Sequence, residues 1–253
     1  MTHHTAKKRF GQNFLTNDYV INEIIGIINP KPQEFIVEIG PGLAALTKPI
    51  MEHTNKLNVV ELDRDIIKYL KTTFDDKLVI HEGDALKFDY TFNNEIIRVI
   101  GNLPYNISTP LLFHLAKYHN IKDMHFMLQK EVVERICAKP NNGDYGRLTV
   151  MLQYKFECFK MLDVSRECFD PAPKVESAII RLIPRPLIQW QAVNEIKLNQ
   201  VVTAAFNQRR KTIQNSLKNI ISAETLHKLN IDLKKRAENI TVSEYVELTS
   251  YIN

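Results

Sequence analysis

The sequence predicts an α/β fold, with a mostly parallel β-sheet in the first part of the chain and a smaller all-helical domain after it. Short apolar runs alternate with stretches of helical periodicity up to about residue 185, whereas the pattern from residue 193 onward is helical. Alternation at this spacing is typical of a parallel sheet that helices cover on both faces. We therefore expect two domains, residues 1–185 and residues 186–253.

Seven apolar runs are the expected strands. Five precede residue 130, and four of these are apolar enough to be buried in a parallel sheet. The five are FIVEIG (35–40), LNVVELD (57–63), LVIHEGD (78–84), IIRVIGN (96–102) and MHFMLQ (124–129). Two later runs, KFECFKMLDV (155–164) and ESAIIRLIP (176–184), have the pattern of a closing pair of strands.

Helix start and stop signals lie between and after these runs. Asn17 can cap a helix whose apolar positions follow the helical repeat until Asn29-Pro30. Residues 65–73 and 108–118 are also expected to be helical. Thr241 and Glu244, three positions apart, form the pattern of a capping box for the last helix.

Composition limits the class of protein. The chain has 253 residues, of which 44% are hydrophobic and 25% charged, as in soluble globular proteins. No apolar run reaches the roughly 18 residues of a membrane span, so we expect a cytoplasmic protein. Three cysteines, Cys137, Cys158 and Cys168, lack paired or metal-binding spacing. They are expected to be free thiols, with no metal site.

Positive charge is concentrated in the last third of the chain. Residues 1–178 contain 22 Lys and Arg against 23 Asp and Glu, whereas residues 179–253 contain 11 against 6. An excess of this kind fits a surface that faces a polyanion, and it also fits an ordinary solvated helical surface.

Polar residues at successive strand ends predict a nucleoside pocket. Ligands of an open parallel sheet bind beyond the carboxyl ends of its strands. Gly40 and Gly42 follow the first run and let the backbone approach a ligand, but Ala45 replaces the third glycine of a dinucleotide-binding turn. Glu61 can accept hydrogen bonds from ribose hydroxyls, and Asp84 can accept one from an adenine amino group. A nucleoside without phosphates indicates S-adenosylmethionine as the cofactor.

The fourth strand ends in Asn102-Leu103-Pro104-Tyr105, a sequence suited to binding an aromatic amine. The amide oxygen of Asn102 and the carbonyl oxygen of Pro104 can both accept hydrogen bonds from one NH₂ group. Tyr105 offers a flat face on which a base can stack. The lone pair of an aromatic amine is delocalised into the ring, so the amine is a poor nucleophile. Two acceptors that hold its hydrogens favour a pyramidal nitrogen, and they therefore act mainly in the transition state of methyl transfer.

These motifs together resemble the ribosomal RNA adenine N6-dimethyltransferase family, most closely its bacterial small-subunit branch. The resemblance covers nearly the whole chain. It is carried by QNFL (12–15), VEIGPG (37–42), ELD (61–63), GDAL (83–86), NLPYNIS (102–108), FDPAPKVES (169–177) and AFNQRRKTIQNSL (205–217). The chain departs from the family at Ala44, where glycine usually follows Gly-Pro-Gly-Leu.

The resemblance implies a fold and a set of site residues. The fold is the Rossmann-like class I methyltransferase fold, with a mostly parallel seven-stranded sheet and a helical RNA-binding domain. The residues implied to bind the cofactor are Asn13, Leu15, Gly40, Glu61, Asp84 and Asn102. The catalytic residues are Asn102, Pro104, Tyr105 and Phe169, of which Phe169 is implied to stack on the second face of the target adenine.

Basic residues near both ends of the chain are the expected RNA contacts. Lys7, Lys8 and Arg9 can form an arm over the site. Lys174 lies in a stiff proline loop where it can meet a phosphate. Three adjacent cations, Arg209, Arg210 and Lys211, would repel one another unless a polyanion lay near, so we expect them to contact RNA phosphates.

By resemblance, the substrate is two neighbouring adenines in the terminal hairpin loop of 16S rRNA, within the immature small ribosomal subunit. Each adenine would receive two methyl groups, and the enzyme would act as a monomer. Two alternatives stay open. One is a large-subunit (23S) rRNA adenine methyltransferase of the macrolide-resistance type, and the other is a mainly non-catalytic assembly factor. A nucleotide oxidoreductase is disfavoured because the chain has no phosphate-binding loop.

Overall fold

The computed structural model describes residues 12–252, except residue 75 and residues 187–193. The chain forms two compact units. The first comprises the residues up to 133 together with 159–184, and the second comprises 134–158 and the residues from 185 onward. The expected division at residue 185 therefore differs from the structure for residues 134–158. That segment contains helix α6 (Arg147–Lys155), whose Val150 and Tyr154 are buried in the core of the second unit.

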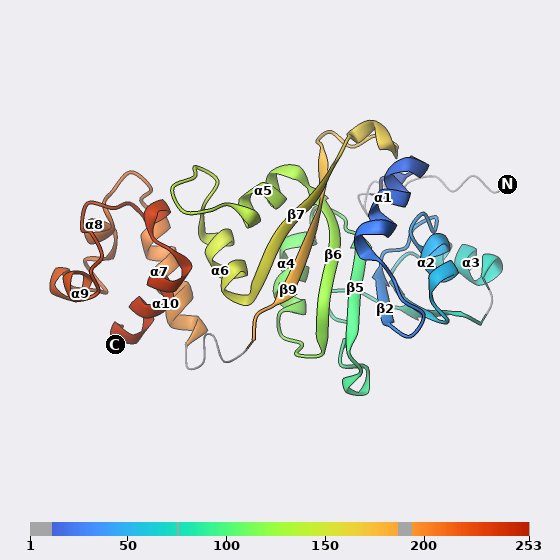
Figure 1. The fold of residues 1–253 in the computed structure, drawn as a ribbon, viewed down its shortest axis with the longest axis horizontal. Coiled ribbons are helices and arrows are strands. Elements are labelled where there is room, and N and C mark those ends of the chain that lie inside the picture. The colour runs from blue at the N-terminus through green and yellow to red at the C-terminus, as the bar shows by residue number, and fades with distance from the viewer. Residues whose placement is uncertain (1–11, 75, 187–193, 253) are drawn as a thin grey trace. The chain divides into compact units, whose positions relative to one another are not determined.

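A seven-stranded sheet in the order β4-β3-β2-β5-β6-β9-β7 organises the first unit (Figure 1). The strands are β2 (Phe35–Ile39), β3 (Leu57–Glu61), β4 (Leu78–Glu82), β5 (Ile97–Asn102), β6 (Ile121–Gln129), β7 (Phe156–Val164) and β9 (Ser177–Pro184). β2 to β6 pair in parallel, and β9 pairs antiparallel with β6. The mostly parallel sheet and its seven expected strands are thus confirmed.

Helices cover the sheet. Their bounds are α1 (Asp18–Ile28), α2 (Thr47–His53), α3 (Arg64–Thr73), α4 (Ser108–Leu115) and α5 (Lys130–Cys137). The three expected after Asn17, at 65–73 and at 108–118 are present, whereas α2 and α5 were not among the predicted helices. Figure 1 shows α1 in front of the strands and α4 behind them. Asn17 caps α1 by accepting a hydrogen bond from the backbone N–H of Val20, and Asn29 ends the helix in a left-handed conformation. α4 ends three residues earlier than residue 118, where we expected it to end.

A short two-stranded sheet joins distant parts of the first unit. β1 (Phe14–Leu15) pairs antiparallel with β8 (Phe169–Asp170). The backbone N–H of Thr16 also donates to the carbonyl of Cys168 at 2.8 Å. Residues 12–16, which we call the N-terminal segment, are thereby fixed against the loop that precedes β9.

The second unit is helical apart from the start of β7, among the residues that the structure describes. Besides α6 it contains α7 (Glu195–Phe206), α8 (Ile213–Leu217), α9 (Ala223–Lys228) and α10 (Val242–Leu248). The expected capping box is present at α10, where Thr241 and Glu244 exchange side chain to backbone hydrogen bonds. No helix in the described part of the chain is long and apolar enough to cross a membrane.

A buried ion pair fixes the start of β5, the strand that ends in Asn102. Arg98 binds both carboxylate oxygens of Asp123 in β6, at 2.7 and 3.2 Å. It also binds Glu34 at 2.6 Å and the carbonyl of Ile28 at 2.7 Å. Burial raises the pKa of Asp123, but hydrogen bonding to Arg98 outweighs it and holds this pKa below its usual value. The pair also explains why β6 begins at Ile121, three residues before our expectation: Asp123 is buried because Arg98 compensates its charge.

Replacing Arg98 with alanine should destabilise the protein by about 3–5 kcal/mol, because the carboxylate of Asp123 would stay buried without its partner. Chemical denaturation measures this change. Arg64→Ala is the matched control, since its ion pair with Glu82 is exposed and should contribute under about 1 kcal/mol. Equal effects of the two substitutions would contradict the assignment.

Candidate active site

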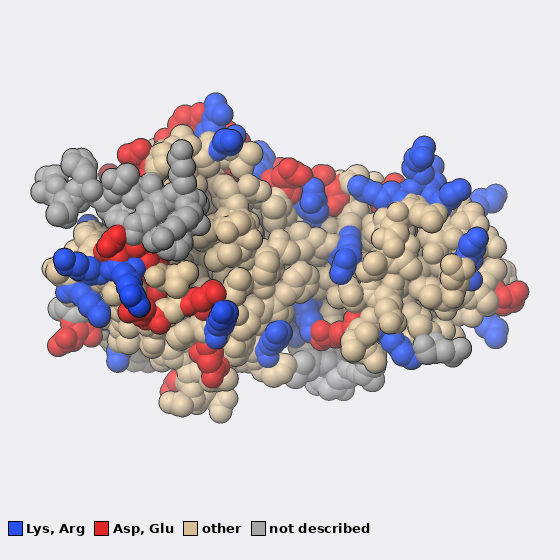
Figure 2. Space-filling view, turned by 180° about the vertical axis from the view of Figure 1, so that it is seen from behind, with Lys and Arg blue, Asp and Glu red and all other residues tan. Residues whose placement is uncertain are grey.

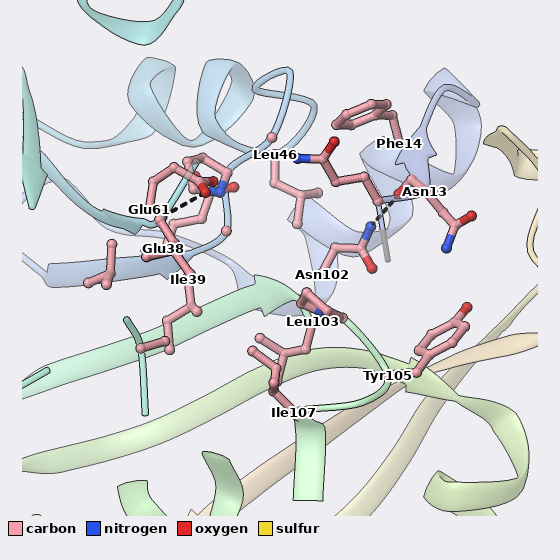
Figure 3. A pocket seen from close by; sticks show the side chains of 18 of the residues that line it. Asn13, Phe14, Glu38, Ile39, Leu46, Glu61, Asn102, Leu103, Tyr105 and Ile107 are labelled. Carbon is pink, nitrogen blue, oxygen red and sulfur yellow. Dashed lines mark hydrogen bonds between the residues drawn. The ribbon is translucent and has the colours of Figure 1, made fainter. Parts of the chain in front are cut away.

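A cavity of about 380 Å³ lies at the carboxyl ends of the parallel strands in the first unit. Its walls come from the turns after β2, β3, β4 and β5 and from the N-terminal segment. Figure 3 shows Glu38 and Glu61 on one side of the cavity and Asn13, Asn102 and Tyr105 on the other. The predicted residues that line it are Asn13, Leu15, Gly40, Glu61, Asp84, Asn102, Pro104 and Tyr105.

In the glycine turn after β2, backbone without side chains lines the cavity. Gly40 and Gly42 have φ angles of 65° and 53°, in the left-handed region that favours glycine. A Cβ atom on Gly42 would lie 3.2 Å from the ring of Phe14, so the turn and the N-terminal segment are in close contact. Ala44 is also left-handed, at φ 70°, which explains why glycine is usual there. Its methyl group is fully buried in the hydrophobic core.

Two of the predicted acidic residues lie where the next strands end. Glu61 is the last residue of β3, and its carboxylate accepts hydrogen bonds from the backbone N–H groups of Leu62 and Asp63 at 2.8 and 2.7 Å. Burial raises the pKa of Glu61. Asp84 follows β4 and accepts a hydrogen bond from the N–H of Leu86 at 2.9 Å. The backbone therefore holds both carboxylates at the wall of the cavity.

Glu38 is a third acidic lining residue, which sequence reasoning missed. It lies in β2, is 2% exposed, and accepts a hydrogen bond from the hydroxyl of Thr47 at 2.7 Å. Burial raises its pKa to about 7, and the nearby negative charge of Glu61 adds to this effect. Its place in the apolar run FIVEIG suggested only a strand residue.

The chemistry of the lining favours a cationic nucleoside over a dinucleotide. Among the residues that the structure describes, those that line the cavity include carboxylates but no Lys, Arg or His. A pyrophosphate group would need cations or a helix N-terminus with several free N–H groups. A positively charged sulfonium compound with ribose and adenine groups suits this set of acceptors, so the residues fit S-adenosylmethionine.

Asn102 and the N-terminal segment meet at the edge of the cavity. The amide nitrogen of Asn102 donates to the backbone carbonyl of Asn13 at 3.1 Å, as the dashed line in Figure 3 shows. Because this bond uses the nitrogen, the amide oxygen is left as an acceptor. Gly101, the preceding residue, is a further site residue that sequence reasoning missed. A Cβ atom there would lie 2.4 Å from the carbonyl oxygen of Ile39, so only glycine allows β5 to approach β2 here.

The two predicted aromatic residues are placed differently. Tyr105 lines the cavity, and its hydroxyl is 2.8 Å from the hydroxyl of Ser177. Phe169 is not a lining residue. Its side chain is 5% exposed and belongs to the hydrophobic core, opposite Leu15 in the β1–β8 pair. Packing against this core stabilises the apolar ring more than exposure in the cavity would.

The predicted RNA contacts lie outside the cavity and are exposed. Lys174 is in the loop before β9, in the first unit. Arg210 and Lys211 are exposed in the second unit, where Thr212 forms a β-bridge with Arg236. Arg209 is partly engaged through a hydrogen bond to the carbonyl of Gly143. Figure 2 shows Lys and Arg side chains gathered along one edge of this unit, with few acidic ones. Lys7, Lys8 and Arg9 lie outside the described residues.

The strand order, with a cavity at the carboxyl ends of the parallel strands, is that of the class I methyltransferase fold, and this fold implies S-adenosylmethionine as the methyl donor. The sequence then places the protein more narrowly: residues 3–253 match the family model described as ribosomal RNA adenine dimethylase, and the chain belongs to that family.

Relatives and solved structures agree with this assignment. The chain is 51% identical to "Ribosomal RNA small subunit methyltransferase A" from Nitrosospira multiformis, over 99% of this chain and 97% of the relative. It resembles the crystal structure of a dimethyladenosine transferase from Plasmodium falciparum, with a TM-score of 0.80, 25% identity, and coverage of 93% and 95% of the two chains. The 23S rRNA methyltransferase ErmE shares the fold, with a TM-score of 0.73, 23% identity, and coverage of 95% and 99%.

Glu38→Gln should change how stability depends on pH. The unfolded chain releases the Glu38 proton near pH 4.5, whereas the folded protein holds it to about 7. Between these values the folded state binds more protons, so the free energy of unfolding falls as pH rises through 7. Relative to the variant, the wild-type protein should lose on the order of 2–3 kcal/mol between pH 4 and pH 8. Denaturation at a series of pH values measures this loss. An identical profile for both proteins would exclude it, and the exposed Glu52→Gln serves as the control.

Proposed function

We propose that this protein dimethylates N6 of two adjacent adenosines in the 3′-terminal hairpin loop of 16S rRNA, with S-adenosylmethionine as the methyl donor. The observation that carries the proposal is the arrangement at Asn102, whose amide oxygen is left as an acceptor at the edge of a cavity whose described lining contains carboxylates and no cationic side chain. Family membership supports the reaction, and the small-subunit name of the 51% identical relative supports the substrate.

The cofactor would be held by the residues at the strand ends. Glu61 is the acceptor for the ribose hydroxyls and Asp84 for the adenine amino group, while Gly40 lets the backbone approach the ligand. Asn13, Leu15 and Asn102 also line the cavity and would border the cofactor. When bound, S-adenosylmethionine supplies a methyl group on a positively charged sulfur.

Asn102 and Pro104 would activate the adenine amine. Their oxygens accept the two N6 hydrogens and favour a pyramidal nitrogen, whose lone pair is then available for attack. The bound cofactor would supply the methyl group that N6 attacks, and its sulfur would keep the electron pair of the carbon–sulfur bond. The proton leaves to water afterwards, so no strong base is required. In the second transfer N6 carries one hydrogen, so the position of the Pro104 carbonyl becomes more critical.

Aromatic side chains would hold the base. Tyr105 lines the cavity and offers one stacking face. We propose that Phe169 covers the other face. Because this ring is buried in the structure, stacking requires Phe169 and the start of the loop that follows it to move when RNA binds, while Glu176 stays fixed.

The basic surface of the second unit would dock on RNA. Arg210 and Lys211 lie beside the strand-like segment around Arg236, and the backbone N–H of Ile213 donates to the carbonyl of Lys235. Two basic segments are thereby brought together, which suits a phosphate backbone. Lys174 and Arg209 complete the proposed contacts. We propose that the protein acts as a monomer in the cytoplasm, on the immature small subunit.

The proposal is tested in cells that lack this protein, by mass spectrometry of rRNA from both ribosomal subunits. We expect N6,N6-dimethyladenosine to be lost from small-subunit rRNA and restored by the wild-type gene. Loss from large-subunit rRNA would favour the 23S alternative. Unchanged methylation in both subunits would favour a non-catalytic assembly factor.

The same assay includes two site variants. Asn102→Ala should reduce methylation about 100-fold, because it removes an acceptor that acts in the transition state. Pro104→Ala should increase the monomethyl fraction. Asn55→Ala, at an exposed turn, is the control and should restore full dimethylation. Normal mono- and dimethyl yields from both site variants would overturn the site assignment.

Removing two cations from the second unit should weaken RNA binding without affecting the cofactor. For Arg210→Ala/Lys211→Ala we expect the plot of log affinity against log salt concentration to become shallower by about 1–2, as two phosphate contacts are lost. Binding to small subunits at several salt concentrations measures the slope. Lys68→Ala/Lys71→Ala removes the same charge from the exposed face of α3 and should leave the slope unchanged. Equal slopes for the two double variants would exclude this surface.

A further inference from the structure

The hydroxyl of Tyr105 lies 2.8 Å from the hydroxyl of Ser177, a residue to which neither the motif chemistry nor the proposed mechanism gives a role. We propose that Ser177 is a positioning residue, which holds the ring of Tyr105 where the target base stacks. This inference rests on the proposed function of Tyr105.

Among the described residues, the bond to Ser177 is the hydrogen bond that the side chain of Tyr105 forms. Tyr105 follows β5 in a turn and is only partly buried. The neighbouring backbone is held by bonds from Leu103 to the carbonyl of Met127 and from Ser108 to the carbonyl of Tyr105. These bonds fix the main chain but not the side chain. Because the phenol oxygen lies on the Cβ–Cγ axis, a hydrogen bond there fixes where the ring points, which rotation about χ1 would otherwise change.

Ser177 is a rigid anchor for this bond. It is fully buried, is the first residue of β9, and lies opposite Gln129 in the β6–β9 pair. Its neighbour Glu176 is held through its carbonyl by the N–H of Lys130 and through its carboxylate by the N–H of Arg166. Because the backbone around Ser177 is held in this way, its hydroxyl has little freedom to move. It can therefore restrict the position of the side chain that binds it.

The hydrogen bonds of Ser177 favour a role in positioning. Among the described residues, Tyr105 is the side chain that its hydroxyl binds. The bond joins the loop after β5 to the end of the loop that carries Phe169 and Lys174. The ring of Tyr105 is thereby fixed relative to two strands of the sheet, β5 and β9.

A double-mutant cycle with Ser177→Ala and Tyr105→Phe tests the proposal, with purified protein and unmethylated small subunits. Each variant should lower kcat for methyl transfer roughly 3- to 10-fold, the effect of one hydrogen bond. The KM for S-adenosylmethionine should not change. The double variant should be no worse than either single variant, because all three lack the same bond. Thr54→Val removes a buried hydroxyl elsewhere in the first unit and should leave kcat unchanged.

The outcomes separate this inference from the proposed function. If Tyr105→Ala keeps full activity, the proposed role of Tyr105 fails. If Tyr105→Ala is impaired but Ser177→Ala has wild-type kcat, the role of Ser177 fails. It also fails if the loss of kcat in the double variant equals the product of the losses in Ser177→Ala and Tyr105→Phe. Should Ser177→Ala not fold, Ser177→Thr decides: it keeps a hydroxyl, so kcat within twofold of wild type supports the proposal and a tenfold loss overturns it.

Discussion

The site depends on the close approach of two strand ends. β2 and β5 are neighbours in the sheet, and Gly101 lets the backbone of β5 pass next to the carbonyl of Ile39. Any side chain at Gly101 would push the strands apart. Because they stay together, the glycine turn after β2 and the loop that begins at Asn102 open into one cavity. The proposed methyl donor and the proposed acceptor nitrogen are therefore held by adjacent pieces of main chain.

The N-terminal segment completes this cavity from a distant part of the sequence. The side chain of Gln12 bonds to Asp63 at 3.0 Å, the carbonyl of Asn13 receives the bond from Asn102, and Phe14 packs against Gly42. The N-terminal segment therefore contacts residues at the carboxyl ends of three strands, β2, β3 and β5. The orientation of the Asn102 amide, on which the proposed chemistry rests, is set by this segment and not by the strand that carries the residue.

Strand ends were predictable from sequence because apolar runs and their polar last residues are local signals. The seven strands, the capping residues Asn17 and Thr241, and the cavity positions of Glu61, Asp84 and Asn102 all follow from such signals. Contacts between distant residues were not predictable. The start of β6 depends on the charge of Arg98, the assignment of residues 134–158 to the second unit depends on which core receives α6, and the burial of Phe169 depends on its pairing with Leu15.

The β1–β8 pair has a consequence for how the protein is made. Residues 14 and 15 emerge early during translation, but their partners 169 and 170 follow more than 150 residues later. The interior strand β6 likewise has both of its edges paired only after β9 has been made. A nascent chain can form β2 to β5 while its cavity still lacks a wall. The N-terminal segment can therefore pair with β8 only after residue 170 has been made, and contacts of such long sequence separation form slowly relative to helices.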